Sequence, residues 1–299
     1  MAERRSDALE ALARQLEASP DYRVLRAVTP PARLADVPDG ARVGVYLDLE
    51  TTGLDQAGDA LIELGLVRFA YHDDQVLGTL DEIAGFEDPG RPIPEEVTRL
   101  TGIDDTMVAG QALDDERVRA LLDEAVLVVA HNASFDRPFA ERRFPFLAEL
   151  AWACTLRDVP WREEGFEGSG LQALVMASGA FFEGHRAVED CYAGLFLLDR
   201  RLPRSGERVL RALRRNAHRR EVRLWAAQAP FDHKDLLKQR GYRWSPEARS
   251  WWCDVREEAL AAEEEWLREH VFGGRLPRLP RRTVDAYSRY SQRVGDTPA

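Results

Sequence analysis

The segment that most constrains the fold is residues 43–50, in which apolar side chains occupy every second position. Because successive side chains of a strand point to opposite faces, this period of two predicts a β-strand. Asp48 and Glu50 lie two residues apart near its end, so both emerge on one face. Paired carboxylates on an otherwise apolar strand repel each other and lose hydration unless cations neutralise them. Taken alone, the pair is also compatible with an exposed strand end.

Two further acids extend this pair. Asp136 falls in the first turn of a helix expected to begin at Ser134, after a buried strand, and a helix N-terminus favours an anion. Asp190 lies on a later helix, and His185 is expected on the loop leading into it. Hard cations take oxygen ligands, and phosphoryl-transfer sites hold two of them about 3.5–4 Å apart. One strand and two helices thus supply a candidate two-metal site.

The rest of the chain alternates strand and helix patterns, which predicts an α/β domain. Further strands are expected at 62–71, 76–86 and before residue 130, and helices at 6–18, 92–100, 114–124, 134–143 and 187–202, with a further element of the domain at 170–177.

The charge distribution divides the chain near residue 200. The formal net charge is −11, but residues 1–200 carry −19 and residues 201–299 carry +8. We therefore expect a helical arm over residues 1–40, a catalytic domain over 41–202, and a smaller basic, aromatic-rich α+β domain with a tail over 203–299. The basic part is a candidate polyanion-binding surface, although arginine-rich composition explains the charge equally well.

Within the basic part, residues 207–223 predict an arginine-studded helix, and an aromatic-rich segment follows. Rings such as Trp225, Tyr242 and Trp251 either stack on unpaired bases or form the core of a small domain. The Pro/Arg-rich tail after Gly274 is expected to be loosely held.

Some classes are disfavoured by the sequence. No apolar stretch reaches the roughly 18 residues of a membrane span, and the N-terminus has no apolar signal core. Three scattered cysteines outside any CxxC pattern disfavour disulfides and a thiolate zinc site. We expect a cytoplasmic protein.

Three motifs resemble a known family. YLDLETTGLD (residues 46–55), VAHNASFDRPF (129–139) and HRAVEDC (185–191) are similar, in order and separation, to the motifs of the DEDDh (DnaQ-like) 3′–5′ exonucleases, which include the epsilon subunit of DNA polymerase III and ribonuclease T. The resemblance covers about residues 41–202. It implies a ribonuclease H-like exonuclease fold, a mixed sheet flanked by helices, and metal-dependent removal of nucleotides from 3′ ends.

The resemblance also implies roles for individual residues. The metal ligands, for two Mg²⁺ or Mn²⁺ ions, would be Asp48, Glu50, Asp136 and Asp190, with His185 as general base. The terminal nucleotide would be held by Thr51, Thr52, Gly53 and Leu54, with Leu54 against its base. Asn132 and Phe135 also match the second motif. Their role is either to bind substrate or to cap the helix and pack it against the sheet.

These implications lead to one expected function and two alternatives. We expect a 3′–5′ exonuclease that releases nucleoside 5′-monophosphates from DNA, preferably single-stranded. The alternatives are an exoribonuclease of the ribonuclease T or oligoribonuclease kind and a non-catalytic nucleic-acid-binding protein. Residues 230–252 are similar to a module that accompanies primases and exonucleases, and residues 205–299 could instead hold a protein partner. Because the motifs end before residue 202, a chain ending near Arg204 is expected to cleave short oligonucleotides.

Overall fold

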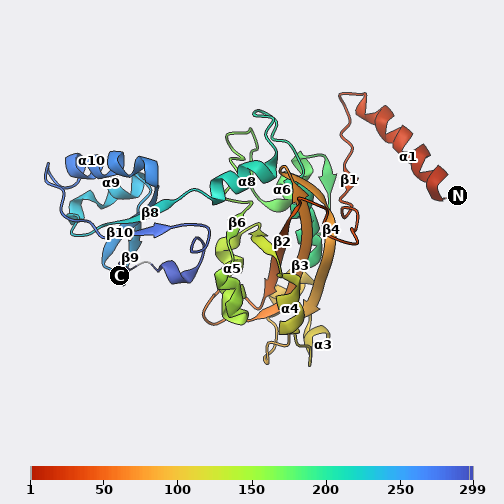
Figure 1. Ribbon diagram of the computed structural model, residues 1–299, viewed down its shortest axis with the longest axis horizontal. Coiled ribbons are helices and arrows are strands. Elements are labelled where there is room, and N and C mark those ends of the chain that lie inside the picture. Colours follow the sequence, from red (N-terminus) through yellow and green to blue (C-terminus); the bar gives the residue numbers. More distant parts are fainter. Residues whose placement is uncertain (1, 296, 299) are drawn as a thin grey trace.

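The computed structural model describes residues 2–295, 297 and 298. An N-terminal arm leads into a central α/β body, and a second, smaller body follows it (Figure 1). The arm consists of α1 (Ala2–Glu17) and a two-residue strand β1 (Arg26–Ala27), which pairs in parallel with β7 (Ala180–Phe181). None of the described helices is long and apolar enough to cross a lipid bilayer.

The central body is built on a five-stranded mixed sheet in the order β4-β3-β2-β5-β6. Within this sheet, β2, β3 and β4 pair antiparallel, whereas β5 pairs in parallel with β2 and β6 pairs in parallel with β5. The strands are β2 (Arg42–Thr51), β3 (Leu61–His72), β4 (Gln75–Phe86), β5 (Ala125–Ala130) and β6 (Trp152–Cys154). Helices flank the sheet, so the ribonuclease H-like fold class expected from the sequence is confirmed.

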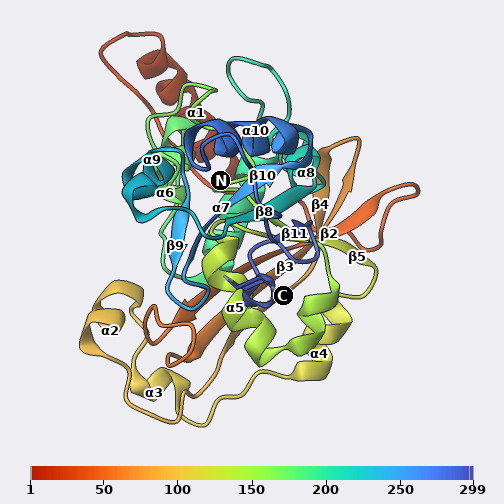
Figure 2. The same cartoon turned by 90° about the vertical axis from the view of Figure 1, so that its left-hand side faces the viewer.

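Each face of the sheet has its own hydrophobic core. On one face, Tyr46 of β2 packs with side chains of α6 (Leu171–Ala177) and α7 (Ala187–Leu198). On the other face, Leu47 packs with α4 (Asp115–Leu121) and α5 (Ala133–Arg143). The alternating side chains of β2 are therefore buried in two cores, one on each face of the sheet, and neither face is open to solvent along this strand. The two short helices α2 (Glu95–Thr101) and α3 (Asp105–Val108) lie beyond one end of the sheet (Figure 2).

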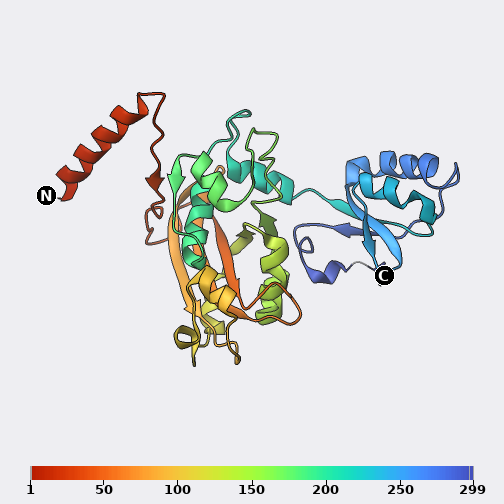
Figure 3. The ribbon, with the colours of Figure 1, turned by 180° about the vertical axis from the view of Figure 1, so that it is seen from behind.

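The second body is a four-stranded antiparallel sheet in the order β11-β8-β10-β9. Two helices, α9 and α10, lie together on one side of it (Figure 3). Its elements are β8 (Glu221–Ala226), α9 (Lys234–Gln239), β9 (Arg243–Ser245), β10 (Ser250–Arg256), α10 (Leu260–His270) and β11 (Arg281–Val284). The described 3₁₀ turns of the chain are η1 (Pro145–Glu149), η2 (Phe231–His233), η3 (Glu257–Ala259) and η4 (Gln292–Val294).

The segment that joins the two bodies differs from the sequence-based expectation. The helix predicted over residues 207–223 is α8 (Val209–Ala217), and Glu221 already begins β8. Val209, Leu210 and Leu213 of α8 lie in the hydrophobic core of the central body. The apolar stripe of this helix thus faces the central body, whereas Arg211 and Arg215 are exposed and Arg214 pairs with Asp74. The central body extends at least to Ala217, beyond the boundary expected at residue 202.

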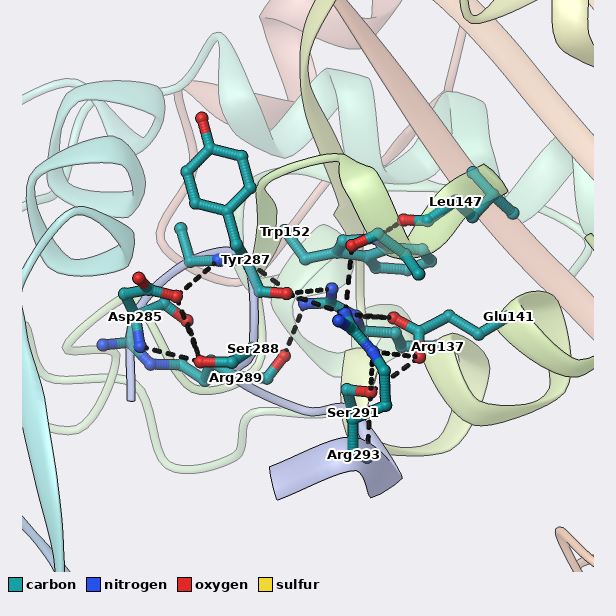
Figure 4. A network of polar contacts seen from close by, with 12 residues as sticks. Arg137, Glu141, Leu147, Trp152, Asp285, Tyr287, Ser288, Arg289, Ser291 and Arg293 are labelled. Carbon is teal, nitrogen blue, oxygen red and sulfur yellow. Dashed lines mark hydrogen bonds and ion pairs between the residues drawn. The ribbon is translucent and has the colours of Figure 1, made fainter. Parts of the chain in front are cut away.

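The tail was expected to be loosely held, and this expectation is wrong. After β11, the chain returns to the central body, where the backbone N–H of Trp152 in β6 donates to the carbonyl of Ala286 at 2.8 Å. We call residues 285–293 the C-terminal strap. Its contacts with α5 centre on Arg137, a side chain with 0% exposure (Figure 4). Arg137 donates to the carbonyl oxygens of Ala286 (3.2 Å), Tyr287 (2.6 Å) and Arg289 (2.7 Å).

The aromatic rings of the second body separate into two groups. Trp225 and Tyr242 are buried, so for them the core interpretation holds. Trp244 keeps 48% of its surface exposed and Phe231 keeps 75%. Which rings are free for a ligand is therefore decided by the fold and not by the composition.

Candidate active site

The first two predicted ligands lie at the end of β2, on the central strand of the sheet. Asp48 is opposite Gly65 in the β2–β3 register, and Glu50 is opposite Glu63. Both carboxylates are partly buried. The register shifts between Glu50 and Thr51, and this irregularity ends the regular pairing where the predicted nucleotide-binding turn begins.

A close approach of helix and sheet brings the third motif to the same place. A Cβ added to Gly65 would lie 2.4 Å from the carbonyl carbon of Ala187, the first residue of α7. About two turns further along α7, Gly194 lies against Tyr46, and its Cβ would meet that ring at 2.0 Å. Only glycine at these two positions lets α7 lie so close to the sheet. The first turn of α7, which carries Asp190, is thereby placed beside Asp48.

The second motif enters through α5. Asp136 lies in the first turn of this helix and is only 3% exposed. The helix begins at Ala133 with Asn132 as N-cap, not at Ser134 as expected, and the hydroxyl of Ser134 instead donates to Asn132 Oδ1 at 2.9 Å. Phe135 packs on Phe139 within the helix, at 5.1 Å between ring centroids. Packing is thus an established role for Phe135.

The electrostatics show that these acids form one cluster. Burial, followed by the charges of Asp136, Asp190 and Glu50, raises the pKa of Asp48 well above its usual value. Burial also raises the pKa of Glu50 to about 7 and that of Asp136 to about 8. The pKa of Asp190 rises to about 6 for the same reason, although the His185 N–H opposes this rise. The folded chain therefore holds several carboxylates whose charged forms are costly.

The cluster has the donor chemistry of a hard-cation site. No arginine, lysine or histidine of the described residues forms an ion pair with Asp48, Glu50, Asp136 or Asp190. Carboxylate oxygens are the ligands that Mg²⁺ and Mn²⁺ prefer. As they stand, no three His, Cys, Asp or Glu side chains of the described residues are close enough to enclose one ion. The donor chemistry of the cluster nevertheless fits a hard divalent ion.

His185 lies on the loop immediately before α7, as expected. Its φ is 71°, a left-handed conformation that is uncommon for a residue with a side chain. The backbone N–H of His185 donates to Asp190 Oδ2 at 2.9 Å, which helps hold this conformation. Its imidazole is exposed, next to the carboxylate cluster but outside it. Left-handed side-chain-bearing residues of this kind are concentrated at functional sites.

The predicted nucleotide-binding turn is braced from within. Thr51 Oγ1 donates to the Gly53 carbonyl at 2.6 Å, and Thr52 Oγ1 donates to Asp59 Oδ1 at 3.0 Å. Both threonines are buried, whereas Leu54 is 82% exposed. The turn therefore presents an apolar leucine to solvent while its polar side chains are used for its own structure.

A model of the exonuclease family matches residues 45–197, about half of the chain and all three motifs. The chain belongs to the exonuclease family. It is a DnaQ-like 3′–5′ exonuclease acting on nucleic acid, which confirms the resemblance and the enzyme class expected from the motifs.

Relatives are found among bacterial DNA polymerases. The chain is 33% identical over 159 residues to the PolC-type DNA polymerase III of Caldanaerobacter subterraneus subsp. tengcongensis, covering 50% of this chain and 11% of that protein. The PolC-type polymerase of Listeria monocytogenes is 34% identical over 158 residues, covering 50% of this chain and 10% of that protein. The exonuclease thus spans about a tenth of the length of these curated relatives.

Solved structures were also compared. Exonuclease X in complex with 5′-overhanging duplex DNA is 26% identical and covers 52% of this chain and 89% of its own, with a TM-score of 0.40. Exonuclease I of E. coli with a dA16 oligonucleotide is 16% identical and covers 83% of this chain and 64% of its own, with a TM-score of 0.46.

Two residues that sequence reasoning missed position the third motif of the exonuclease. Glu63 is 1% exposed and accepts from Arg186 Nη2 at 2.9 Å and from the backbone N–H of Ala187 at 3.1 Å. Glu63 of β3 therefore anchors the N-terminus of α7, in the turn that carries Asp190. The sequence signal was available, because a glutamate inside the apolar strand at 61–67 needs a partner if it is buried.

Proposed function

We propose that this exonuclease removes nucleoside 5′-monophosphates from the 3′ ends of DNA, preferably single-stranded, by metal-dependent hydrolysis. The observation that carries the proposal is the buried carboxylate cluster around Asp48, which has no cationic partner among the described side chains. A protein that only binds nucleic acid gains nothing from such a cluster, because its charges are costly and repel phosphates. DNA is favoured over RNA because the matched relatives are DNA polymerases.

The proposed ligands are Asp48, Glu50, Asp136 and Asp190, and two Mg²⁺ or Mn²⁺ ions bound there would supply Lewis-acid stabilisation of the developing charge on the phosphodiester. His185 is the proposed general base. Its exposed position on the loop before α7 allows the imidazole to accept a proton from the attacking water and release it to solvent.

The substrate end is proposed to lie on the turn from Thr51 to Leu54. Leu54 packs against the face of the last base, and an apolar contact of this kind does not read base edges, so cleavage tolerates sequence. Asn132 and Phe135 border the same site from the start of α5.

The test compares wild type with two matched variants. Asp48→Asn removes one carboxylate of the cluster, whereas Glu189→Gln removes an exposed carboxylate beside Asp190 on the same helix. Single-stranded DNA, duplex DNA and RNA, each labelled at the 5′ end, are digested with Mg²⁺, with Mn²⁺ or with EDTA. We expect stepwise shortening of single-stranded DNA with either metal, full activity in Glu189→Gln and none in Asp48→Asn. Activity in EDTA or in Asp48→Asn contradicts the proposed metal chemistry, and faster shortening of RNA contradicts the DNA preference.

A further inference from the structure

A cleft of about 1050 Å³ lies between the central body and the second body. Gln56, Ser134 and Arg157 line it from the nuclease side, and Arg243 and Trp244 line it from the second sheet. Its volume is at the upper end of the range for small-molecule pockets, roughly 300–1,000 Å³. An open space of this size between two bodies suits a stretch of polymer better than a small ligand.

One end of the cleft is lined by residues that lie within or next to the first two motifs in the sequence, and none of the proposed metal ligands lines it. Gln56 follows Leu54 by two residues, and its Nε2 donates to the carbonyl of Ser134 at 2.9 Å. Ser134 in turn precedes Asp136 by two residues. The side chain of Gln292, from the C-terminal strap, donates to Gln56 Oε1 at 2.9 Å. One end of the cleft is thus formed by Gln56, which follows the first motif, by Ser134 of the second motif and by the strap.

The wall of the second body offers an aromatic face. Trp244 is 48% exposed and lies in this cleft. Trp251 contacts it edge-on, at 5.6 Å between centroids, and Trp251 itself packs on the core of the second body. The exposed indole is therefore held from one side, which lowers the entropy cost of stacking a ligand on it.

Charged side chains of the cleft fall into paired and unpaired sets. Arg289 is paired with Asp158 and Glu221. The exposed side chains of Arg157 and Arg243 form no ion pair with any described residue, and the Arg243 guanidinium lies 5.4 Å from the ring centroid of Trp252. Glu247 is likewise without a cationic partner among the described residues, so the unpaired charge favours an anion modestly.

We propose that this cleft binds the unpaired strand of the nucleic acid upstream of the 3′ end, with Trp244 stacked on a base and Arg157 and Arg243 on phosphates. An exposed ring beside arginines is the chemistry that binds single strands without reading sequence. A duplex is a poorer occupant, since its base faces are hidden in the stack. The inference rests on the proposed function, because it takes the 3′ end to lie at the Asp48 cluster.

Binding is measured on the full chain in EDTA, so that nothing is cleaved. The probes are fluorescent oligothymidylates of about 4 and about 16 nucleotides, the span of site sizes on single-strand-binding folds. Trp244→Ala is compared with Phe231→Ala, an exposed ring outside the cleft, and Arg243→Ala with Arg275→Ala, an exposed arginine outside it. Melting temperatures confirm that each variant is folded.

We expect Trp244→Ala to weaken binding of the longer probe by roughly 5- to 150-fold, the range for stacking on one base, and Phe231→Ala to leave it unchanged. Arg243→Ala should reduce the slope of log affinity against log salt by about 0.7, the value for one phosphate contact on a single strand. In Mg²⁺, cleavage of the shorter probe should be the same in Phe231→Ala and Arg275→Ala as in wild type.

A probe series with one abasic site moved along the strand locates the stacked base. Wild type should lose affinity at one position a few nucleotides from the 3′ end, and Trp244→Ala should not. If Trp244→Ala and wild type bind with equal affinity while wild type still degrades DNA, the cleft proposal is overturned and the proposed function is not. If Trp244→Ala loses as much affinity for oligoglutamate as for the oligothymidylate, the cleft binds acidic protein segments, and this result also overturns the cleft proposal. If wild type degrades no nucleic acid, the proposed function fails instead.

Discussion

Arg137 and Tyr287 are 150 residues apart in the chain, yet Nη2 of Arg137 donates to the Tyr287 carbonyl at 2.6 Å (Figure 4). Burial lowers the pKa of Arg137 to about 10, and Glu141, whose Oε1 lies 2.6 Å from Arg137 Nε, opposes this shift. Arg137 directly follows the proposed ligand Asp136. The C-terminal strap is therefore joined to the helix that carries this proposed ligand.

Replacing Arg137 by leucine should destabilise the protein strongly. The carbonyls of Ala286, Tyr287 and Arg289 and the carboxylate of Glu141 would lose their common donor, and breaking a buried ion pair costs about 3–5 kcal/mol. Arg293→Ala is the matched control, because Arg293 also pairs with Glu141 but is half exposed, and such pairs contribute up to about 1 kcal/mol. Urea unfolding measures both losses. Similar values for the two variants would show that the strap does not depend on Arg137.

Truncation after Arg204 should abolish folding of the nuclease, in contrast to the expectation from the motifs alone. Such a chain lacks α8, whose Val209, Leu210 and Leu213 are core residues, and it lacks the strap. Removing residues 2–17 is the control, because no described side chain of α1 lies in a hydrophobic core. Circular dichroism melting should show a cooperative transition for the second truncation only. A folded, active chain ending at Arg204 would return the boundary to residue 202.

Asp48→Asn should stabilise the metal-free protein. The substitution removes one charge from a cluster in which burial and neighbouring carboxylates raise the pKa of Asp48. In EDTA we expect a melting temperature at least about 2 °C above wild type, which corresponds to roughly 1 kcal/mol at this size. Mg²⁺ should then raise the melting temperature of wild type but not of the variant, because only a bound ligand shifts stability. An equal Mg²⁺ shift in both proteins places the ion elsewhere.

His185→Ala should slow the chemical step and leave binding intact. Loss of a general base costs about 10²- to 10⁴-fold in rate. Single-turnover digestion of a short DNA strand gives that rate, and binding in EDTA gives the affinity. Because the His185 N–H, and not its side chain, contacts Asp190, alanine preserves this hydrogen bond. A variant that binds poorly but cleaves at the normal rate would assign His185 to substrate binding.

Acid should destabilise the protein through His131. Burial lowers the pKa of His131 to about 4, and its Nδ1 lies 2.9 Å from Thr155 Oγ1. The unfolded chain takes up this proton below pH about 6.5 and the folded chain only near pH 4, so the free energy of unfolding falls between these values. The limit is about 3 kcal/mol, at 1.36 kcal/mol per pKa unit. The free energy of unfolding is measured against pH for wild type and for His131→Gln. The other titrating groups are the same in both proteins, so the difference between the two curves isolates His131. Parallel curves would refute the prediction.

Local patterns were sufficient for the elements and for the candidate ligands. The alternation at residues 43–50 needs only the geometry of one strand, and Asp48 and Glu50 share a face for the same reason. The order and separation of the three motifs identified the family, which the family match confirms. The helix pattern at 187–202 was correct to within a few residues, because it depends on spacing within one segment.

Only the tertiary structure decided which faces are covered. An amphipathic segment such as α8 has the same pattern whether its apolar stripe meets the nuclease core or another surface, and an indole has the same sequence signature in a core as in a cleft. Trp225 is buried and Trp244 is 48% exposed although both are strand residues of the same sheet, because what covers each side chain depends on the packing of the whole body. The approach of Ala187 to Gly65 and the hold of Arg137 on the strap join residues more than 100 positions apart. Such contacts depend on how whole elements pack, which no local spacing encodes.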